Sequence, residues 1–268
     1  MRLPIRVVLF DVYGTLFISA AGDIGTAQER NNAEAFQVAL RASGFCPLRD
    51  GTGEWGMRLL DRTIRAVHAR QRQEGISYPE IEIRQIWEQV LSLLQQEGWI
   101  QGDIGPEAVM RLAVEYECRV NPVWPMPGLQ GTLQGLRERG IVLGIISNAQ
   151  FFTPLLFPAL LNRELNHLGF APHLCTWSYL AREAKPSSRL FSPVLTRLER
   201  DGISPAQTLY VGNDCLNDMW PAAMLGWKTA LFAGDRRSLR LREGEPRCAG
   251  VTPDLVVTDL RQLLSVPD

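Results

Sequence analysis

The chain has 268 residues, of which 46% are apolar and 21% are charged, proportions that are ordinary for a soluble globular protein. Its 28 Lys and Arg residues nearly balance its 29 Asp and Glu residues, so it lacks the basic excess that binding to nucleic acid or an anionic membrane requires, and both are excluded as expected partners. The five cysteines form no C-x-x-C pair and no run of about 18 apolar residues occurs, so we expect a cytoplasmic protein without structural zinc or a membrane span.

The first predicted element is a buried strand that ends on an aspartate. Residues 7–10 form an uninterrupted apolar run typical of a parallel strand, and Asp11 follows, just before a Gly-Thr turn. The carboxyl end of such a strand faces the crevice where open α/β sheets bind their ligands. Because an acid without a task is costly to bury there, we interpret Asp11 as a candidate nucleophile and Thr15 as a companion in the same motif.

The next part of the chain has the pattern of a helical domain. Between residues 18 and 125 we find no convincing strand, and a cluster of Pro and Gly at 122–128 marks its end. We therefore predict an α/β core built from residues 1–17 and 126–268, with an all-helical domain, residues 18–125, inserted in it. The expected helices lie near 26–43, 54–73, 78–96 and 106–120.

Beyond residue 128, strand and helix patterns alternate. This alternation predicts a doubly wound parallel sheet with helices on both faces. The expected strands are 141–146, 174–177, 208–211, 229–232 and 255–257, and the expected helices are 129–139, 188–200 and 216–225.

Three further motifs carry polar side chains where these elements end or begin. One ends the strand predicted over 141–146, one precedes the helix predicted over 188–200, and one follows the strand predicted over 208–211. Because the carboxyl ends of parallel strands meet at one edge of a sheet, we expect these side chains to converge on Asp11. They are Ser147 and Asn148, then Lys185, then Asn213, Asp214 and Asp218.

In this order the four motifs resemble those of the haloacid dehalogenase (HAD) superfamily, and the helical insert resembles that superfamily's C1 cap. The resemblance implies a small-molecule substrate and a covalent intermediate, formed when Asp11 attacks an electrophilic centre and cleaved by water. It implies that Thr15 and Asn148 belong to the catalytic set. Ser147 would bond a bound oxyanion, and Lys185 would neutralise the nucleophile and a phosphate.

A metal site is also expected. Asp11 and Asp214 would repel each other at close range unless a cation lies between them, and Mg²⁺ is the expected ion for hard oxygen ligands. The Asp11 carboxylate, the Tyr13 backbone carbonyl and Asp214 would be its ligands. Asp218 would support them from behind. If the fourth motif is aligned from Asp218 with a spacing one residue longer, Asn213 rather than Asp214 is the metal ligand. Both alternatives stay open.

Tyr13 departs from the phosphatases of the superfamily, which carry a second aspartate at this position as general acid and base. Tyrosine here is typical of the 2-haloacid dehalogenase branch, whose halide leaving group needs no proton. Other marks of that branch are missing. Phe191 stands where it carries a tyrosine, and residues 212–214 read Gly-Asn-Asp where it carries Ser-Ser-Asn.

Three functions remain for the chain. We expect a Mg²⁺-dependent phosphohydrolase acting on a small phosphorylated metabolite, because a metal-free site would have to bury the charge of Asp214 beside Asp11. The alternatives are a metal-independent 2-haloacid dehalogenase and a non-catalytic binding protein that kept the fold. The sequence specifies neither the substrate nor the oligomeric state.

Overall fold

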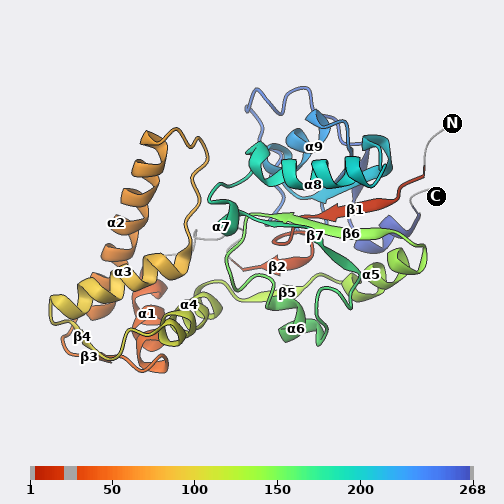
Figure 1. The fold of residues 1–268 in the computed structure, drawn as a ribbon. Coiled ribbons are helices and arrows are strands. Elements are labelled where there is room, and N and C mark those ends of the chain that lie inside the picture. Colours follow the sequence, from red (N-terminus) through yellow and green to blue (C-terminus); the bar gives the residue numbers. More distant parts are fainter. Residues whose placement is uncertain (1–3, 21–28, 266–268) are drawn as a thin grey trace. The chain divides into compact units, whose positions relative to one another are not determined.

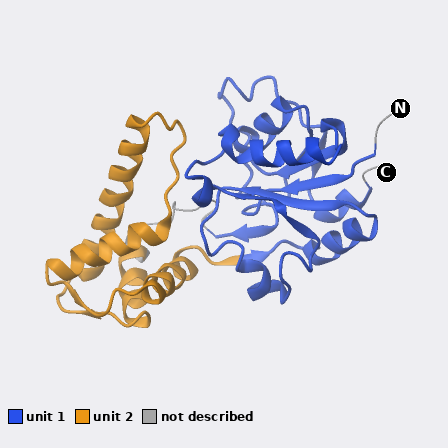
Figure 2. Cartoon of the chain, in the orientation of Figure 1, with its two compact units in different colours: residues 1–23, 124–268 blue, residues 24–123 orange. Residues whose placement is uncertain are grey.

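The computed structural model describes residues 4–20 and 29–265, and the chain divides into two compact units (Figure 2). Unit 1 joins residues 1–23 to residues 124–268, and unit 2 consists of residues 24–123. The predicted boundaries, after residues 17 and 125, differ from this division by a few residues.

Unit 1 is built on a six-stranded sheet in which every neighbouring pair is parallel, which confirms the α/β prediction (Figure 1). The first strand of the chain is central, since β1 pairs with β6 on one side and with β8 on the other. In sheet order the strands are β10 (Leu255–Val257), β9 (Lys228–Phe232), β8 (Thr208–Gly212), β1 (Val7–Phe10), β6 (Val142–Ser147) and β7 (Phe170–Trp177).

Helices cover both faces of this sheet. Figure 1 shows α8 (Ser188–Arg200) and α9 (Trp220–Met224) on one face and α5 (Leu129–Glu138) on the other. The apolar stripe of α8 is buried in the core beside Tyr210 of β8 and Trp227. Shorter elements complete the unit: β2 (Phe17–Ser19) paired with β5 (Val123–Pro125), α6 (Leu156–Leu161), α7 (Ser178–Ala181), a π-helical turn (Cys215–Met219), and 3₁₀ turns at Pro205–Gln207 and Leu260–Ser265.

The register of the central strands brings the motif residues to one edge. Phe10 is level with Ile145 of β6 and with Val211 of β8. The residues that follow these positions therefore leave the sheet side by side at the carboxyl ends of the strands. All four residues of β1 are buried, as expected for a central parallel strand.

Unit 2 contains four helices, each overlapping a predicted segment, although residues 26–28 of the first segment lie outside the described residues. Its core holds an aromatic cluster in which Phe36 stacks on Trp87 with centroids 5.2 Å apart and Tyr116 meets both rings edge-on. The helices are α1 (Glu29–Ala42), α2 (Thr52–Gln73), α3 (Ile83–Gln96) and α4 (Pro106–Val120), and β3 (Cys46–Pro47) pairs antiparallel with β4 (Ile100–Gln101).

None of the helices in residues 4–20 and 29–265 combines the length and the apolar character needed to cross a bilayer.

Candidate active site

Asp11 lies directly after β1 and is buried, with 7% of its surface exposed. Its backbone N–H donates to the Val211 carbonyl over 2.9 Å, which fixes the residue between β1 and β8. One carboxylate oxygen, Oδ1, accepts hydrogen bonds from Ser147 Oγ at 2.9 Å and from Lys185 Nζ at 2.7 Å. Three motifs far apart in the sequence therefore meet at this oxygen.

The ammonium of Lys185 lies between two carboxylates. Its Nζ is 2.7 Å from Asp11 and 2.5 Å from Asp218, and all three side chains are buried. Burial acts to lower the pKa of Lys185, but Asp11 and Asp218 outweigh burial and raise this pKa well above its usual value. The lysine therefore supplies a fixed positive charge beside Asp11.

Asn148 positions the backbone of this lysine. Its Oδ1 accepts the backbone N–H of Lys185 at 2.7 Å, so the end of β6 holds the loop that carries Lys185. The neighbouring Ser147 Oγ lies 3.2 Å from the Asn148 carbonyl, a longer contact than the one it makes with Asp11. Within the second motif, the serine contacts the candidate nucleophile and the asparagine holds the lysine's backbone.

Asp218 organises the loop after β8. Its second oxygen accepts the backbone N–H groups of Asn213 at 3.0 Å and Asp214 at 2.9 Å. A Cβ on Gly212 would come within 2.4 Å of the Asp218 carboxylate, so only glycine fits there. Burial and the nearby carboxylates raise the pKa of Asp218 to about 7, although Lys185 acts in the opposite direction.

Asp214, a candidate metal ligand, forms an ion pair with Arg242. The Arg242 guanidinium approaches both of its oxygens, with Nη2 at 2.5 Å from Oδ2 and Nε at 3.0 Å from Oδ1. The backbone N–H groups of Leu216 and Asn217 also donate to Oδ1, as in a helix cap. Arg242, from a later loop, therefore offsets the charge of Asp214, and the sequence analysis did not identify it.

Asn213 lies against the turn that follows Asp11. Thr15 Oγ1 donates to Asn213 Oδ1 at 3.3 Å, and Asn213 Nδ2 donates to the Ser238 carbonyl at 2.5 Å. Gly14 has a φ of +79°, and a Cβ there would collide with Asn213 and Ser238. Of the two alternatives for this motif, the geometry favours Asn213 as the residue next to the nucleophile turn.

Tyr13 is buried, and its phenol oxygen is 3.0 Å from Thr153 Oγ1. A phenol is a poor general acid at neutral pH, because its reference pKa is about 10.

The candidate ligand atoms near Asp11 are oxygens, which suit a hard cation, but few of them carry a negative charge. In the part of the chain that the structure describes, no three His, Cys, Asp or Glu side chains gather as a metal site. Asp11 contributes one carboxylate, and Asn213 contributes an amide oxygen on the adjoining turn. Mg²⁺ is often held by one or two carboxylates together with substrate phosphate, so this set suits Mg²⁺ when a phosphate completes it.

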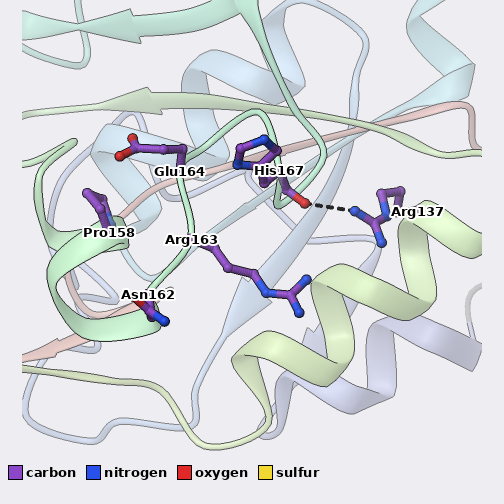
Figure 3. Close-up of a pocket in the computed structure, with 6 residues that line it drawn as sticks. All are labelled: Arg137, Pro158, Asn162, Arg163, Glu164 and His167. Carbon is purple, nitrogen blue, oxygen red and sulfur yellow. Dashed lines mark hydrogen bonds between the residues drawn. The ribbon is translucent and has the colours of Figure 1, made fainter.

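A pocket of about 500 Å³ lies elsewhere on unit 1 (Figure 3). Arg137 precedes β6 and His167 precedes β7, so the pocket lies near the strands' amino ends, opposite the edge of Asp11. Arg137 donates to the His167 carbonyl at 2.7 Å across it. It is therefore separate from the catalytic cluster. Its lining consists of Arg137, Pro158, Asn162, Arg163, Glu164 and His167.

The chain is similar to known proteins over most of its length. A phosphoglycolate phosphatase of Xylella fastidiosa strain Temecula1 is 29% identical over 237 residues, covering 87% of this chain and 82% of that protein. A 2-haloacid dehalogenase from Pseudomonas syringae pv. Tomato shares the fold with a TM-score of 0.55 and 22% identity, over 98% of this chain and 97% of that one. A protein described as a predicted phosphoglycolate phosphatase from Haemophilus somnus also shares the fold, with a TM-score of 0.50 and 16% identity. The match covers 98% of this chain and 97% of that one.

The family comparison covers most of the chain. The match to haloacid dehalogenase-like hydrolases extends over residues 5–226, from the strand before Asp11 to the helix after Asp218. The chain belongs to the haloacid dehalogenase-like hydrolase family.

Proposed function

We propose that this hydrolase acts on a small phosphorylated molecule with Asp11 as nucleophile. The observation that carries the proposal is the asymmetry of the Asp11 carboxylate. Ser147 and Lys185 both donate to Oδ1, and none of the described residues donates to Oδ2. One oxygen is held and the other is available for attack. The phosphatase relative at 29% identity supports a phosphate ester as substrate.

The reaction takes two displacements at phosphorus. Asp11 Oδ2 attacks, the bond from phosphorus to the ester oxygen breaks, and that oxygen leaves with the electron pair and takes a proton from solvent. Water then attacks phosphorus, the bond to Asp11 breaks, and phosphate leaves with the carboxylate restored. Lys185 stays charged throughout and offsets the negative charge around Asp11.

The residues that would hold Mg²⁺ are the Asp11 carboxylate, the Tyr13 backbone carbonyl and the Asn213 amide oxygen. When bound, the ion would neutralise charge on the phosphoryl oxygens. Tyr13 makes a weak proton donor, so we expect substrates whose leaving group needs little protonation, such as acyl or aryl phosphates. We further propose that the helical domain selects the substrate and that the five free thiols reflect a reducing compartment.

The test compares phosphate release from p-nitrophenyl phosphate, acetyl phosphate and phosphoglycolate, with Mg²⁺ and with EDTA. We expect Mg²⁺-dependent release that falls by about 10³-fold or more in Asp11→Asn, because the nucleophile is lost. Asp201→Asn, at the surface end of α8, is the matched control and should keep full activity. Full activity in Asp11→Asn, or no phosphate release from any of the three substrates, would contradict the proposal.

Dehalogenation is the second candidate, and one observation favours it. Arg242 pairs with Asp214, so the charge of this carboxylate does not need a metal to offset it, and Lys185 already pairs with Asp11. Displacement of halide from a 2-haloacid would then need no proton donor at Tyr13. Halide release in EDTA, with no phosphate release, would support this candidate, and failure of both assays would favour a binding protein.

A further inference from the structure

Tyr210 lies in β8 with no exposed surface, and its hydroxyl reaches the polar cluster around Asp11. The phenol oxygen is 3.2 Å from Lys185 Nζ, 2.8 Å from the Ile146 carbonyl and 3.2 Å from Asp218 Oδ1. Tyrosine in the middle of an apolar strand resembles ordinary core in the sequence. In the structure it contacts two of the four motifs.

The number of hydrogen-bond donors on Lys185 indicates a specific role for the Tyr210 hydroxyl. An ammonium has three N–H donors and no acceptor. Asp11 and Asp218 accept two of them, and the Tyr210 oxygen is the third acceptor among the described residues. The Tyr210 proton goes to the Ile146 carbonyl, the nearer acceptor, which leaves an oxygen lone pair for Lys185.

Packing holds the hydroxyl in place. The Tyr210 ring lies 5.7 Å from the ring of Phe191 and 6.4 Å from that of Trp227, centroid to centroid. A ring enclosed in this way cannot turn its hydroxyl away from Lys185 without repacking the core.

We propose that Tyr210 is a positioning residue that fixes the Lys185 ammonium between Asp11 and Asp218. By holding Lys185, it keeps Asp11 Oδ1 engaged and Oδ2 available. The consequence for turnover rests on the proposed function, whereas the effect on Lys185 does not.

The chain offers a direct measurement, because Lys185 and Lys228 are its only lysines. Lys228 pairs with Asp254 at the surface, where its side chain is 49% exposed, so its ammonium protons exchange quickly with water. In protein labelled with ¹⁵N-lysine we expect one slowly exchanging ammonium resonance. Lys185→Arg should remove it and Lys228→Arg should leave it unchanged.

In Tyr210→Phe we expect this resonance to move and its hydrogen exchange to speed up by about tenfold or more, since one N–H loses its acceptor in a buried site. Under the proposed function, kcat should fall by about 10- to 100-fold while KM changes by less than about twofold. Tyr116→Phe, which removes a buried phenol from the helical domain, should change neither quantity.

A purely structural role would instead lower the unfolding midpoint in Tyr210→Phe without moving the ammonium resonance. Should Tyr210→Phe fail to fold, the wild-type protein still gives a test, because an NOE is expected between the Lys185 ammonium and the Tyr210 ring.

An unchanged resonance and exchange rate in Tyr210→Phe, or no such NOE in the wild type, overturns the positioning role. A wild type that hydrolyses no phosphate ester but shows the expected ammonium behaviour contradicts the proposed function and leaves the positioning role standing. The two failures are therefore distinguishable.

Discussion

Arg242 and Asp214 show how one side chain changes the electrostatics of the fourth motif. Three carboxylates, those of Asp11, Asp214 and Asp218, belong to the motifs around Lys185, which is one positive charge. Arg242 adds a second positive charge, with 36% of its side chain exposed against 10% for Asp214. Removing a partner from such a pair leaves a largely buried carboxylate with fewer donors.

We predict that Arg242→Gln lowers the free energy of unfolding by about 1–3 kcal/mol, because Asp214 loses charge-assisted hydrogen bonds in a buried place. Arg261→Gln is the matched control, since Arg261 contacts both oxygens of Asp259 but is 68% exposed. An exposed pair contributes about 0–1 kcal/mol. Urea unfolding at constant m-value measures both variants, and equal losses would show that burial of Asp214 does not matter.

At the scale of the element, helix α2 passes α1 at a distance that only glycine permits. A Cβ on Gly56 would come within 2.0 Å of the Phe36 ring, which is fully buried and stacked on Trp87. The ring cannot move aside without disturbing the aromatic cluster of unit 2.

Gly56→Ala should therefore destabilise the protein by about 1–3 kcal/mol through overpacking, despite the better helix propensity of alanine. Gly131→Ala on α5 is the control, because no atom lies within 4 Å of its Cβ position, and it should be neutral or stabilising by up to about 1 kcal/mol. Thermal unfolding followed by circular dichroism tests both. A neutral Gly56→Ala would mean that the helices have room to separate.

The elements themselves differ in how well the sequence predicts them. Continuous apolar runs mark β1 and β10, whose bounds match the predicted strands. The first half of β7 is missed, because Pro172 and His173 interrupt its apolar pattern and its pairing with β6 shifts register between Phe170 and Cys175. Helix α3 begins at Ile83 rather than at the predicted Tyr78. The side chain of Glu82 caps this start by accepting the backbone N–H of Arg84.

The site shows the same division between local and distant information. The convergence of Asp11, Ser147 and Lys185 follows from two strand ends and one helix start that the sequence marks clearly. Arg242 and Tyr210 could not be found this way, since Arg242 lies in a loop outside the four motifs and Tyr210 lies within an apolar strand, and neither position indicates contact with Asp214 or Lys185. No local pattern encodes such a contact, and only the folded chain shows it.

At the scale of the whole molecule, the pairing and burial of the strands indicate that local stability decreases from the centre of the sheet to its edge. β1 is hydrogen-bonded on both sides and buried, whereas β10 is a three-residue edge strand with Val256 61% exposed. Amides of a central strand exchange only when the core opens, and those of a short edge exchange through local fraying.

We therefore predict that hydrogen exchange, followed by mass spectrometry, is slowest in peptides covering residues 7–10 and much faster in those covering 255–257. Peptides from β8 should resemble β1, because β8 is also paired on both sides. Similar rates for β1 and β10 would mean that the sheet opens as one cooperative unit.

The scarcity of lysine has a practical consequence. Lys185 is buried beside Asp11, so amine-directed reagents such as succinimidyl esters have Lys228 as their accessible side-chain target. Lys228 begins β9, at the opposite end of the parallel strands from Asp11. A fluorophore or surface tether coupled to Lys228 would lie far from Asp11. We therefore expect the labelled or immobilised protein to keep its activity.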